Sequence, residues 1–423
     1  MIPNPADTTD EPAESSWRKS LRKALIRFHV WKDGPVARGR LADDLNLNLP
    51  TVSNCVAELL AAGDLVEEGF ADSTGGRKPQ LLKVNPAKGS VVGLTFSSRG
   101  ISSAWADLKG SLQNVQIYPF NISSGKGRAL SIIREAIGDQ LDAIRAADAG
   151  PVCQIGVGIS GLLNSAEGVS NGFPRFEEWT DVPLRSLIED WHEVPTVLDS
   201  HIAAIALAET IFGQYRDFRN ALYVQLGPGL GLGVVIGGEI YRGSRRNVGE
   251  FGHTTLTGDD GPICYCGSYG CLESIASDYA MVQQAEAALR EGVGTRIPEF
   301  AREPGRITPG AIFRAAQAGD RFATNLVEKV ARLLGTGIAN LVNLFGPDIV
   351  ILGGTMSEAG DLLLDPLCAT LGSKALDRMD KGVAIKTSSF GKDEAIKGAT
   401  TLALHTYMTK DIHSPSGHGR TAA

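Results

Sequence analysis

The residues best suited to chemistry in this chain are one histidine and three cysteines in a glycine-rich stretch. His253 is followed by Cys264, Cys266 and Cys271. Imidazole nitrogen and thiolate sulfur are the ligands that zinc prefers, and four of them complete its tetrahedral shell. Because such a shell leaves no position for a substrate, residues 249–274 predict a closed structural zinc site, one per chain.

The other cysteines, Cys55, Cys153 and Cys368, stand alone and are expected to pack as small apolar side chains. Residues 1–16 are polar and acidic, without the basic-then-apolar order of a signal peptide. No apolar run reaches the ~18 residues of a membrane span. We therefore expect a cytoplasmic protein with a disordered start, in which clustered thiols bind metal rather than form disulfides.

Charge is unevenly distributed along the 423 residues, whose net charge is −7. Residues 17–88 contain 12 Lys and Arg against 8 Asp and Glu, whereas the segments on either side are acidic. The length predicts two or three domains. A basic module on an acidic body favours a nucleic-acid-binding head.

Three helices are expected within this head. Residues 17–31 alternate apolar and basic residues at helical spacing, and a short helix is expected over residues 37–45. A third begins after Asn48, a favourable N-cap, with Pro50 in its first turn. Its buried stripe comprises Val52, Cys55, Val56, Leu59 and Leu60. The short helix and the third helix together resemble a helix-turn-helix, whose second helix enters the major groove of DNA.

Two strands, residues 65–70 and 79–84, follow the third helix and predict a hairpin wing. Basic residues at its tip could reach phosphates or a minor groove. Residues 17–88 thus predict a winged helix-turn-helix, an α+β domain, although the same fold can serve protein contacts. The candidate DNA contacts are Arg38, Arg40, Pro50, Thr51, Ser53, Asn54, Arg77 and Lys78.

The body, residues 89–410, is expected to be a two-lobed α/β structure. Residues 90–120 read as three strands joined by turns, and residues 220–243 repeat strands around a Gly-rich turn. An apolar-faced helix over residues 395–407 is expected to pack back on the body, ahead of a disordered tail from residue 411 to 423.

Several motifs resemble the ROK family of repressors, open reading frames and sugar kinases, which includes the xylose and N-acetylglucosamine repressors. They are TVSNCVAELLAAGDLVEE followed by STGGRKP in the head, and GEFGH with CYCGSYGCLE in the metal loop. The resemblance covers the head and essentially the whole body. It implies the duplicated fold of sugar kinases, actin and heat-shock ATPases, with a sugar in the cleft between lobes. Leu49 departs from the basic residue that relatives often carry, which leaves base preference open.

The resemblance also shows where kinase motifs are altered. The family's D-x-G-x-T loop is replaced by Thr95 to Arg99, and Pro228 interrupts a G-T-G-x-G-x-G loop. At the family's catalytic aspartate stands His201, although an imidazole can act as a base and a two-residue slip would offer Asp199. Because three parts are altered, we expect no kinase activity.

Sugar contacts are implied by the family for Glu250, His253 and Glu273, and Ser200 matches a sugar-binding asparagine. With His201, these are the candidate ligand-binding residues. Glu250 could instead support His253, and Glu273 could be an ordinary acid at a helix start. Residues 176–179 match the segment that shapes the cleft rim in relatives.

Together these features predict a transcriptional regulator, a repressor of carbohydrate-metabolism genes, with a sugar or sugar derivative as effector. Its partner would be double-stranded, palindromic operator DNA, which pairs with a homodimer or homotetramer formed through the body. The rivals are an ATP-dependent sugar kinase with an accessory DNA-binding head, and a family regulator that has lost sugar binding.

Overall fold

The computed structural model describes residues 12–71, 78–97, 100–244, 248–258, 260–303, 305–376 and 382–412, without the side chains of residues 12–16. The chain forms two compact units. The first unit comprises Met1–Ile159, Glu167–Asp199 and Ala399–Ala423, and the second comprises Ser160–Ala166 and Ser200–Gly398. Among the described residues, no helix has both the length and the apolar character needed to cross a bilayer.

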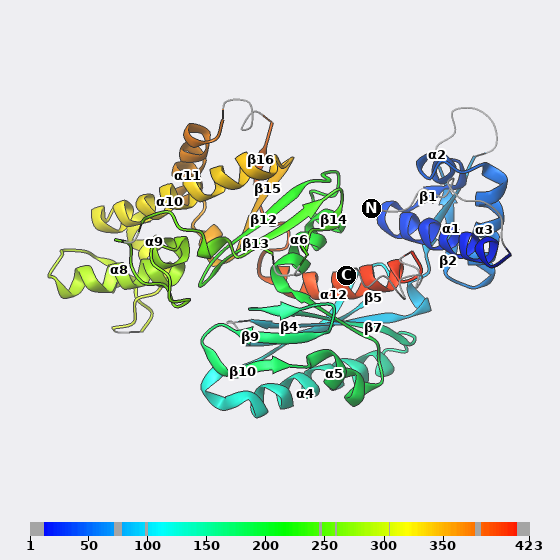
Figure 1. Ribbon diagram of the computed structural model, residues 1–423, viewed down its shortest axis with the longest axis horizontal. Helices are drawn as coiled ribbons and strands as arrows, with labels where there is room; N and C mark the ends of the chain where they lie inside the picture. The colour runs from blue at the N-terminus through cyan, green and yellow to red at the C-terminus, as the bar shows by residue number, and fades with distance from the viewer. Residues whose placement is uncertain are drawn as a thin grey trace, which may run out of the picture. The chain divides into compact units, whose positions relative to one another are not determined.

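The first unit begins with a head of three helices and a small sheet of order β1-β3-β2 (Figure 1). Its elements are α1 (Pro12–Asp33), β1 (Val36–Ala37), α2 (Arg38–Asp44), α3 (Leu49–Ala61), β2 (Leu65–Phe70) and β3 (Gln80–Val84). The three helices and two long strands were all predicted. Helix α1 starts earlier than expected, so residues 12–16 are helical rather than disordered, and residues 1–11 lie outside the described part.

Helix α3 begins as its sequence predicts. The side chain of Asn48 accepts a hydrogen bond from the backbone N–H of Thr51 at 2.8 Å, which satisfies one donor of the first turn. The apolar stripe is buried except for Leu60, which is half-buried. Glu58, which remains partly exposed, pairs with Lys19 at 2.6 Å and Lys23 at 3.3 Å. Helix α1 therefore contacts this side of α3.

A five-stranded sheet of order β11-β7-β4-β5-β6 forms the body of the first unit. Its strands are β4 (Ser90–Ser97), β5 (Gly100–Asp107), β6 (Leu112–Tyr118), β7 (Val152–Ile159) and β11 (Thr196–Ser200). Strands β4, β5 and β6 form an antiparallel meander, and β7 pairs parallel with β4. Helix α4 (Gly125–Ala146) packs on β4, β5 and β6. Also present are α5 (Leu184–His192), β8 (Leu163–Asn164), β9 (Val169–Phe173) and β10 (Phe176–Val182).

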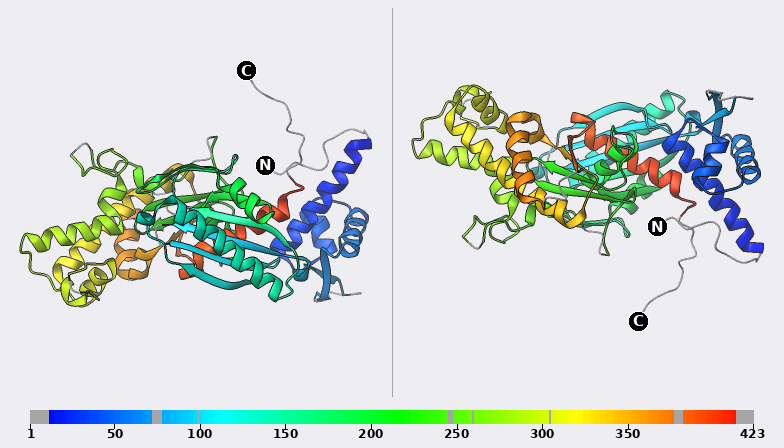
Figure 2. Two further views of the ribbon diagram at one scale, coloured as in Figure 1. Left: turned by 90° about the horizontal axis from the view of Figure 1, so that it is seen from below. Right: turned by 90° about the horizontal axis from the view of Figure 1, so that it is seen from above.

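The last helix, α12 (Glu394–Thr409), packs on the sheet and reaches the head (Figure 2). A Cβ at Gly93 in β4 would lie 2.6 Å from Thr400 Cγ2, so the absence of one permits this approach. Arg27 of α1 donates to the Met408 carbonyl at 3.3 Å and pairs with Asp411 at 3.0 Å. Residues 411 and 412 were expected in a disordered tail, but Asp411 is exposed and ion-paired, and Ile412 is buried. Residues 413–423 lie outside the described part.

The second unit contains a sheet of order β14-β13-β12-β15-β16. Strands β12 (Ala221–Leu226), β13 (Leu230–Ile236) and β14 (Glu239–Ile240) form an antiparallel meander, and β15 (Ile349–Gly353) and β16 (Ala384–Thr387) continue it in parallel. This order repeats that of the first unit, as a duplicated fold requires. The accompanying helices are α6 (His201–Ile211), α7 (Leu272–Ala276), α8 (Asp278–Arg290), α9 (Pro309–Gln317), α10 (Arg321–Phe345) and α11 (Asp361–Lys374).

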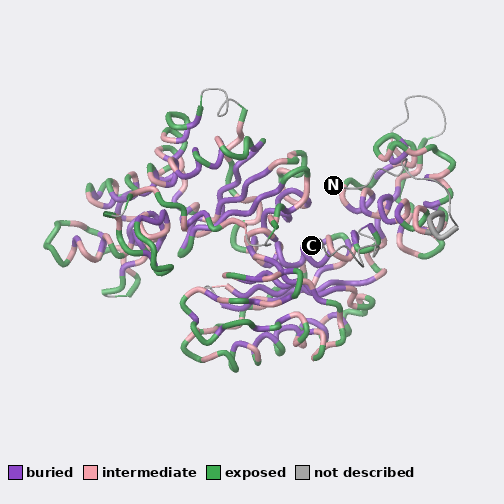
Figure 3. Tube along the Cα trace, in the orientation of Figure 1, coloured by how far each residue is buried: buried purple, intermediate pink, exposed green. Residues whose placement is uncertain are grey.

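Each unit has a buried core centred on its sheet. Central strands β4, β12 and β15 are almost continuously buried (Figure 3), as expected for strands covered on both faces. In the second unit the core extends from the sheet through the apolar faces of α9, α10 and α11. The sheets thus provide rigid scaffolds from which the candidate site residues project.

Candidate functional site

The metal loop folds back on itself between two anchors in the second unit. At its start, Gly249 adopts φ 107°, and a Cβ there would lie 1.9 Å from the Leu232 carbonyl oxygen, so only glycine fits. At its end, Cys271 is the N-cap of α7 and forms a β-bridge with Thr255. A second bridge joins Ile263 and Tyr269. These bridges bring the far end of the loop back to His253.

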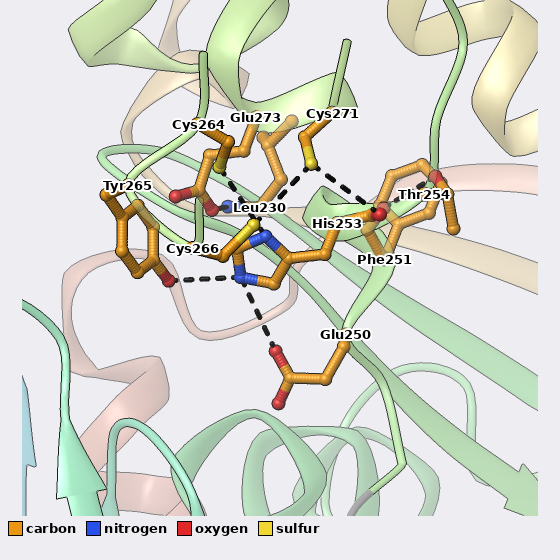
Figure 4. A network of polar contacts seen from close by, with 10 residues as sticks. All are labelled: Leu230, Glu250, Phe251, His253, Thr254, Cys264, Tyr265, Cys266, Cys271 and Glu273. Atoms are coloured by element: carbon orange, nitrogen blue, oxygen red, sulfur yellow. Dashed lines mark hydrogen bonds and ion pairs between the residues drawn. The ribbon is translucent and has the colours of Figure 1, made fainter. Parts of the chain in front are cut away.

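The four predicted metal ligands converge (Figure 4). Cys266 Sγ lies 3.8 Å from Cys271 Sγ, and Cys264 Sγ lies 3.6 Å from His253 Nδ1. All four ligand atoms lie within 4.8 Å of one another. In a tetrahedron with metal–sulfur bonds of about 2.3 Å, sulfur atoms are separated by about 3.8 Å. The donors and their spacing therefore fit a four-coordinate ion of the zinc type.

The three thiols of the metal loop differ in how readily they lose a proton. Burial raises the pKa of the Cys264 thiol, and it raises the pKa of the Cys271 thiol to about 12. A hydrogen bond from the backbone of Ser268 lowers the pKa of Cys266. Because metals bind thiolates, a cation must replace the protons of the buried pair, and its uptake should release protons.

The far side of the His253 ring faces Tyr265 and Glu250 rather than sulfur (Figure 4). The Tyr265 hydroxyl lies 3.1 Å from His253 Nε2, and the Glu250 carboxylate lies 3.9 Å from the same atom. Sequence reasoning missed Tyr265, although its position between Cys264 and Cys266 was a usable signal. Glu250 is largely exposed, so it can support His253 and still reach a ligand.

Glu273 has a different role from that of an ordinary helix-start acid. Its carboxylate accepts a hydrogen bond from the backbone N–H of Leu230 at 2.9 Å. Leu230 is the first residue of β13, directly after the Gly-rich turn that contains Pro228. The Leu232 N–H, in turn, donates to the Gly249 carbonyl at 2.9 Å. Strand β13 thus positions both the start and the end of the metal loop.

The same strand positions the remaining ligand candidates. Ser200 is the N-cap of α6, and His201 is its first residue. A Cβ at Gly231 would lie 2.0 Å from Ile202 Cδ1, so the first turn of α6 packs directly on β13. His201 is buried, and its Nδ1 lies 3.3 Å from Ser160 Oγ. All five predicted ligand residues thus come from elements packed on β13 or hydrogen-bonded to it.

The segment replacing the first kinase loop is packed into the core of the first unit. Thr95 is buried in β4, and Ser98 and Arg99 lie outside the described residues. Next to Thr95, the ring of Phe96 stacks on Phe173 at 4.4 Å and meets Trp179 edge-on at 5.0 Å. In the segment matched to the cleft rim of relatives, Phe176 and Trp179 are buried in this cluster, whereas Glu177 and Glu178 are exposed.

The DNA-contact candidates divide by exposure. Pro50 and Asn54 are exposed on α3, and Thr51 and Ser53 are half-buried beside them. Arg38 pairs with Glu67 at 2.8 Å and Arg40 with Asp44 at 3.4 Å, although both guanidinium groups retain exposed surface. Lys78 is exposed, and Arg77 lies outside the described residues.

Comparisons with known proteins point in one direction. The model of the ROK family matches residues 113–406. A xylose repressor from Caldicellulosiruptor bescii is 31% identical over 378 residues, covering 89% of this chain and 94% of the relative. A glucokinase from Halalkalibacterium halodurans is 29% identical and covers 74% of this chain and 94% of the relative. The solved structure of a ROK family transcriptional regulator, homologous to the Escherichia coli MLC protein, superimposes with a TM-score of 0.80 at 24% identity, over 94% of this chain and 98% of that one.

Proposed function

This chain belongs to the ROK family, and we propose that it is a transcriptional repressor of carbohydrate-metabolism genes whose effector is a sugar or sugar derivative. One observation carries the proposal. Similarity to the xylose repressor spans 89% of the chain, whereas similarity to the glucokinase spans 74%. The additional coverage fits a head that repressors have and the kinase lacks.

The head supports DNA binding as a winged helix-turn-helix. Helices α2 and α3 are separated by a short turn, and α3 exposes small polar residues suited to base edges in a major groove. Arg77 and Lys78 in the wing supply charge for phosphates or a minor groove. Arg38 and Arg40 are proposed phosphate contacts that exchange their carboxylate partners on binding.

DNA binding is testable with the DNA upstream of the chain's own gene. In fluorescence anisotropy at physiological salt, Arg77→Ala should weaken binding by about 1–3 kcal/mol. Arg302→Ala, an exposed arginine of the second unit, is the matched control and should bind as wild type does. Equal affinity of the Arg77 variant and wild type would contradict the proposed role of the wing.

The effector site is proposed around Ser200, His201, Glu250, His253 and Glu273. Carboxylates and an imidazole are strong hydrogen-bonding partners for sugar hydroxyls. The metal, proposed to be a structural zinc ion, would be held by His253 Nδ1 and the three thiolates. It would fix the imidazole so that Nε2 faces away from the ion.

Phosphate transfer is not proposed for this site. Thr95 is buried in β4, Pro228 lacks an N–H donor, and His201 replaces the carboxylate base. Mixing the protein with ATP, magnesium and D-xylose, D-glucose or N-acetylglucosamine should release no ADP above background. Release that disappears in His201→Ala would favour the rival kinase function.

Regulation is proposed to follow from linkage. A sugar that binds one arrangement of the protein more tightly shifts the population toward it and so alters operator affinity. A cytoplasmic homodimer or homotetramer on a palindromic operator suits this mechanism. Titration calorimetry with the same three sugars tests this mechanism. If none of a wider set of sugars binds, the result would favour a regulator without a sugar effector.

A further inference from the structure

Tyr265 is held in a fixed place by its neighbours. It lies between two of the proposed metal ligands, and the Cys264 N–H donates to the Ser268 carbonyl at 2.7 Å. The Gly267 N–H donates to the Cys264 carbonyl at 2.9 Å, which closes a tight turn around Tyr265. Although its backbone is fixed in this way, its side chain is 51% exposed. A large aromatic side chain is thus presented to solvent from a rigid turn.

The Tyr265 hydroxyl lies at the one ring nitrogen of His253 that faces away from the sulfur atoms (Figure 4). With a metal on Nδ1, Nε2 of a neutral imidazole carries the proton and acts as a donor. The phenol oxygen at 3.1 Å accepts from it, whereas the Glu250 carboxylate lies farther away at 3.9 Å. The phenol therefore holds the position in which a sugar hydroxyl would meet His253.

The surroundings of the ring suit a polyol. The carboxylate side chains of Glu273 and Glu250 lie near the Tyr265 ring (Figure 4). The carboxylates offer acceptors for hydroxyl groups, and the half-exposed ring offers an apolar face for sugar C–H groups. Tyr265 therefore lies next to three candidate sugar contacts, which are Glu250, Glu273 and the His253 imidazole.

We infer that Tyr265 is a specificity-determining residue of the effector site, with its phenol oxygen as the internal stand-in for a sugar hydroxyl on His253 Nε2 and its ring as one wall. The inference rests on the proposed sugar-sensing function. Effector binding then exchanges the phenol for a sugar hydroxyl. The phenol lowers affinity by competing, and the ring raises affinity by packing.

These two roles predict opposite effects of two substitutions. Tyr265→Phe removes the competing oxygen and keeps the ring, so the sugar that binds wild type should bind about two- to tenfold more tightly, one hydrogen bond's worth. Tyr265→Ala also removes the wall and should bind it more weakly than Tyr265→Phe, by about fivefold or more. The control is Tyr269→Phe, since Tyr269 lies on the same loop and is 50% exposed; its affinity should match wild type.

Calorimetry with D-xylose, D-glucose and N-acetylglucosamine gives the dissociation constants, and metal analysis of the same samples gives zinc content. Unchanged affinity in Tyr265→Phe, or a loss equal to that of Tyr265→Ala, would overturn the inference while leaving the sugar-sensing function intact. If zinc content falls in each Tyr265 variant whose sugar affinity changes, Tyr265 only supports the structure of the metal loop. If wild type binds none of the sugars, the proposed function fails and the inference fails with it.

Discussion

The two sheets share one strand order, yet the described residues at the two altered kinase loops differ in what they contact. In the first unit, Thr95 and Phe96 are buried near the end of β4, and Phe96 belongs to an aromatic cluster. In the second unit, the glycine turn before β13 remains, but the Leu230 N–H is already bonded to Glu273. A phosphate loop needs space and free N–H donors. The first segment is instead built into the core, and the second turn supports the metal loop.

The sharpest test of this comparison is metal removal, because only the second unit contains the metal loop. Cys271→Ser should abolish binding at the proposed zinc site and lower the melting temperature by roughly 10 °C or more, since metal binding contributes directly to folding. Metal analysis and calorimetric melting measure both. Cys368→Ser, at an exposed thiol in α11, is the control. Full zinc content in Cys271→Ser would contradict the proposed ligand set.

A cavity in the aromatic cluster around Phe96 should destabilise the first unit and leave the metal loop of the second unit unaffected. Phe96 is fully buried, so Phe96→Ala should reduce the free energy of unfolding by about 3–5 kcal/mol. Urea unfolding measures the loss, and Phe96→Leu should lose less because it leaves a smaller cavity. Zinc content should stay at the wild-type level, and a drop would show that the two regions are not independent.

The bond between Glu273 and the glycine turn can be removed without touching the metal. Glu273→Ala leaves the Leu230 N–H without its carboxylate acceptor and should cost about 1–3 kcal/mol of unfolding free energy. Glu273→Gln retains an acceptor oxygen and should lose less. Equal losses in both variants would show that charge, rather than the hydrogen bond, supports the turn.

The smallest expected effect concerns pH dependence at the edge of the second sheet. Burial raises the pKa of Glu209, and hydrogen bonds from Ser388 and Ser389 oppose the rise. Folding then favours the protonated carboxyl, so its contribution to stability falls as pH rises from about 4.5, the ordinary value, through the folded pKa. Glu209→Gln lacks this loss and should gain stability relative to wild type across that range. Melting curves from pH 4 to pH 8 test the sign, and a parallel pH profile would contradict it.

Most of the features that could be predicted from the sequence depend on local patterns of residues. The Asn48 cap, the stripe of α3, the three strands within residues 90–120 and the clustering of His253 with three cysteines follow from spacing that neighbouring residues dictate. Long-range contacts did not follow from spacing. The Glu58 pairs with α1 depend on how two helices pack, and burial of Trp179 depends on a cluster assembled from separate strands. Tyr265 was overlooked because its importance comes from the fold of the loop, which returns it to His253 across twelve residues.

The contact between α12 and the head has a practical consequence for expressing parts of this protein. The family match ends at residue 406, a natural place to cut the gene. A protein ending there lacks Met408 and Asp411, and with them both polar partners of Arg27. The basic head would then lose these two polar contacts and keep only others, such as the edge-on contact between the Phe28 and His405 rings. An affinity tag is therefore safer after residue 423 than on a chain shortened to the family boundary.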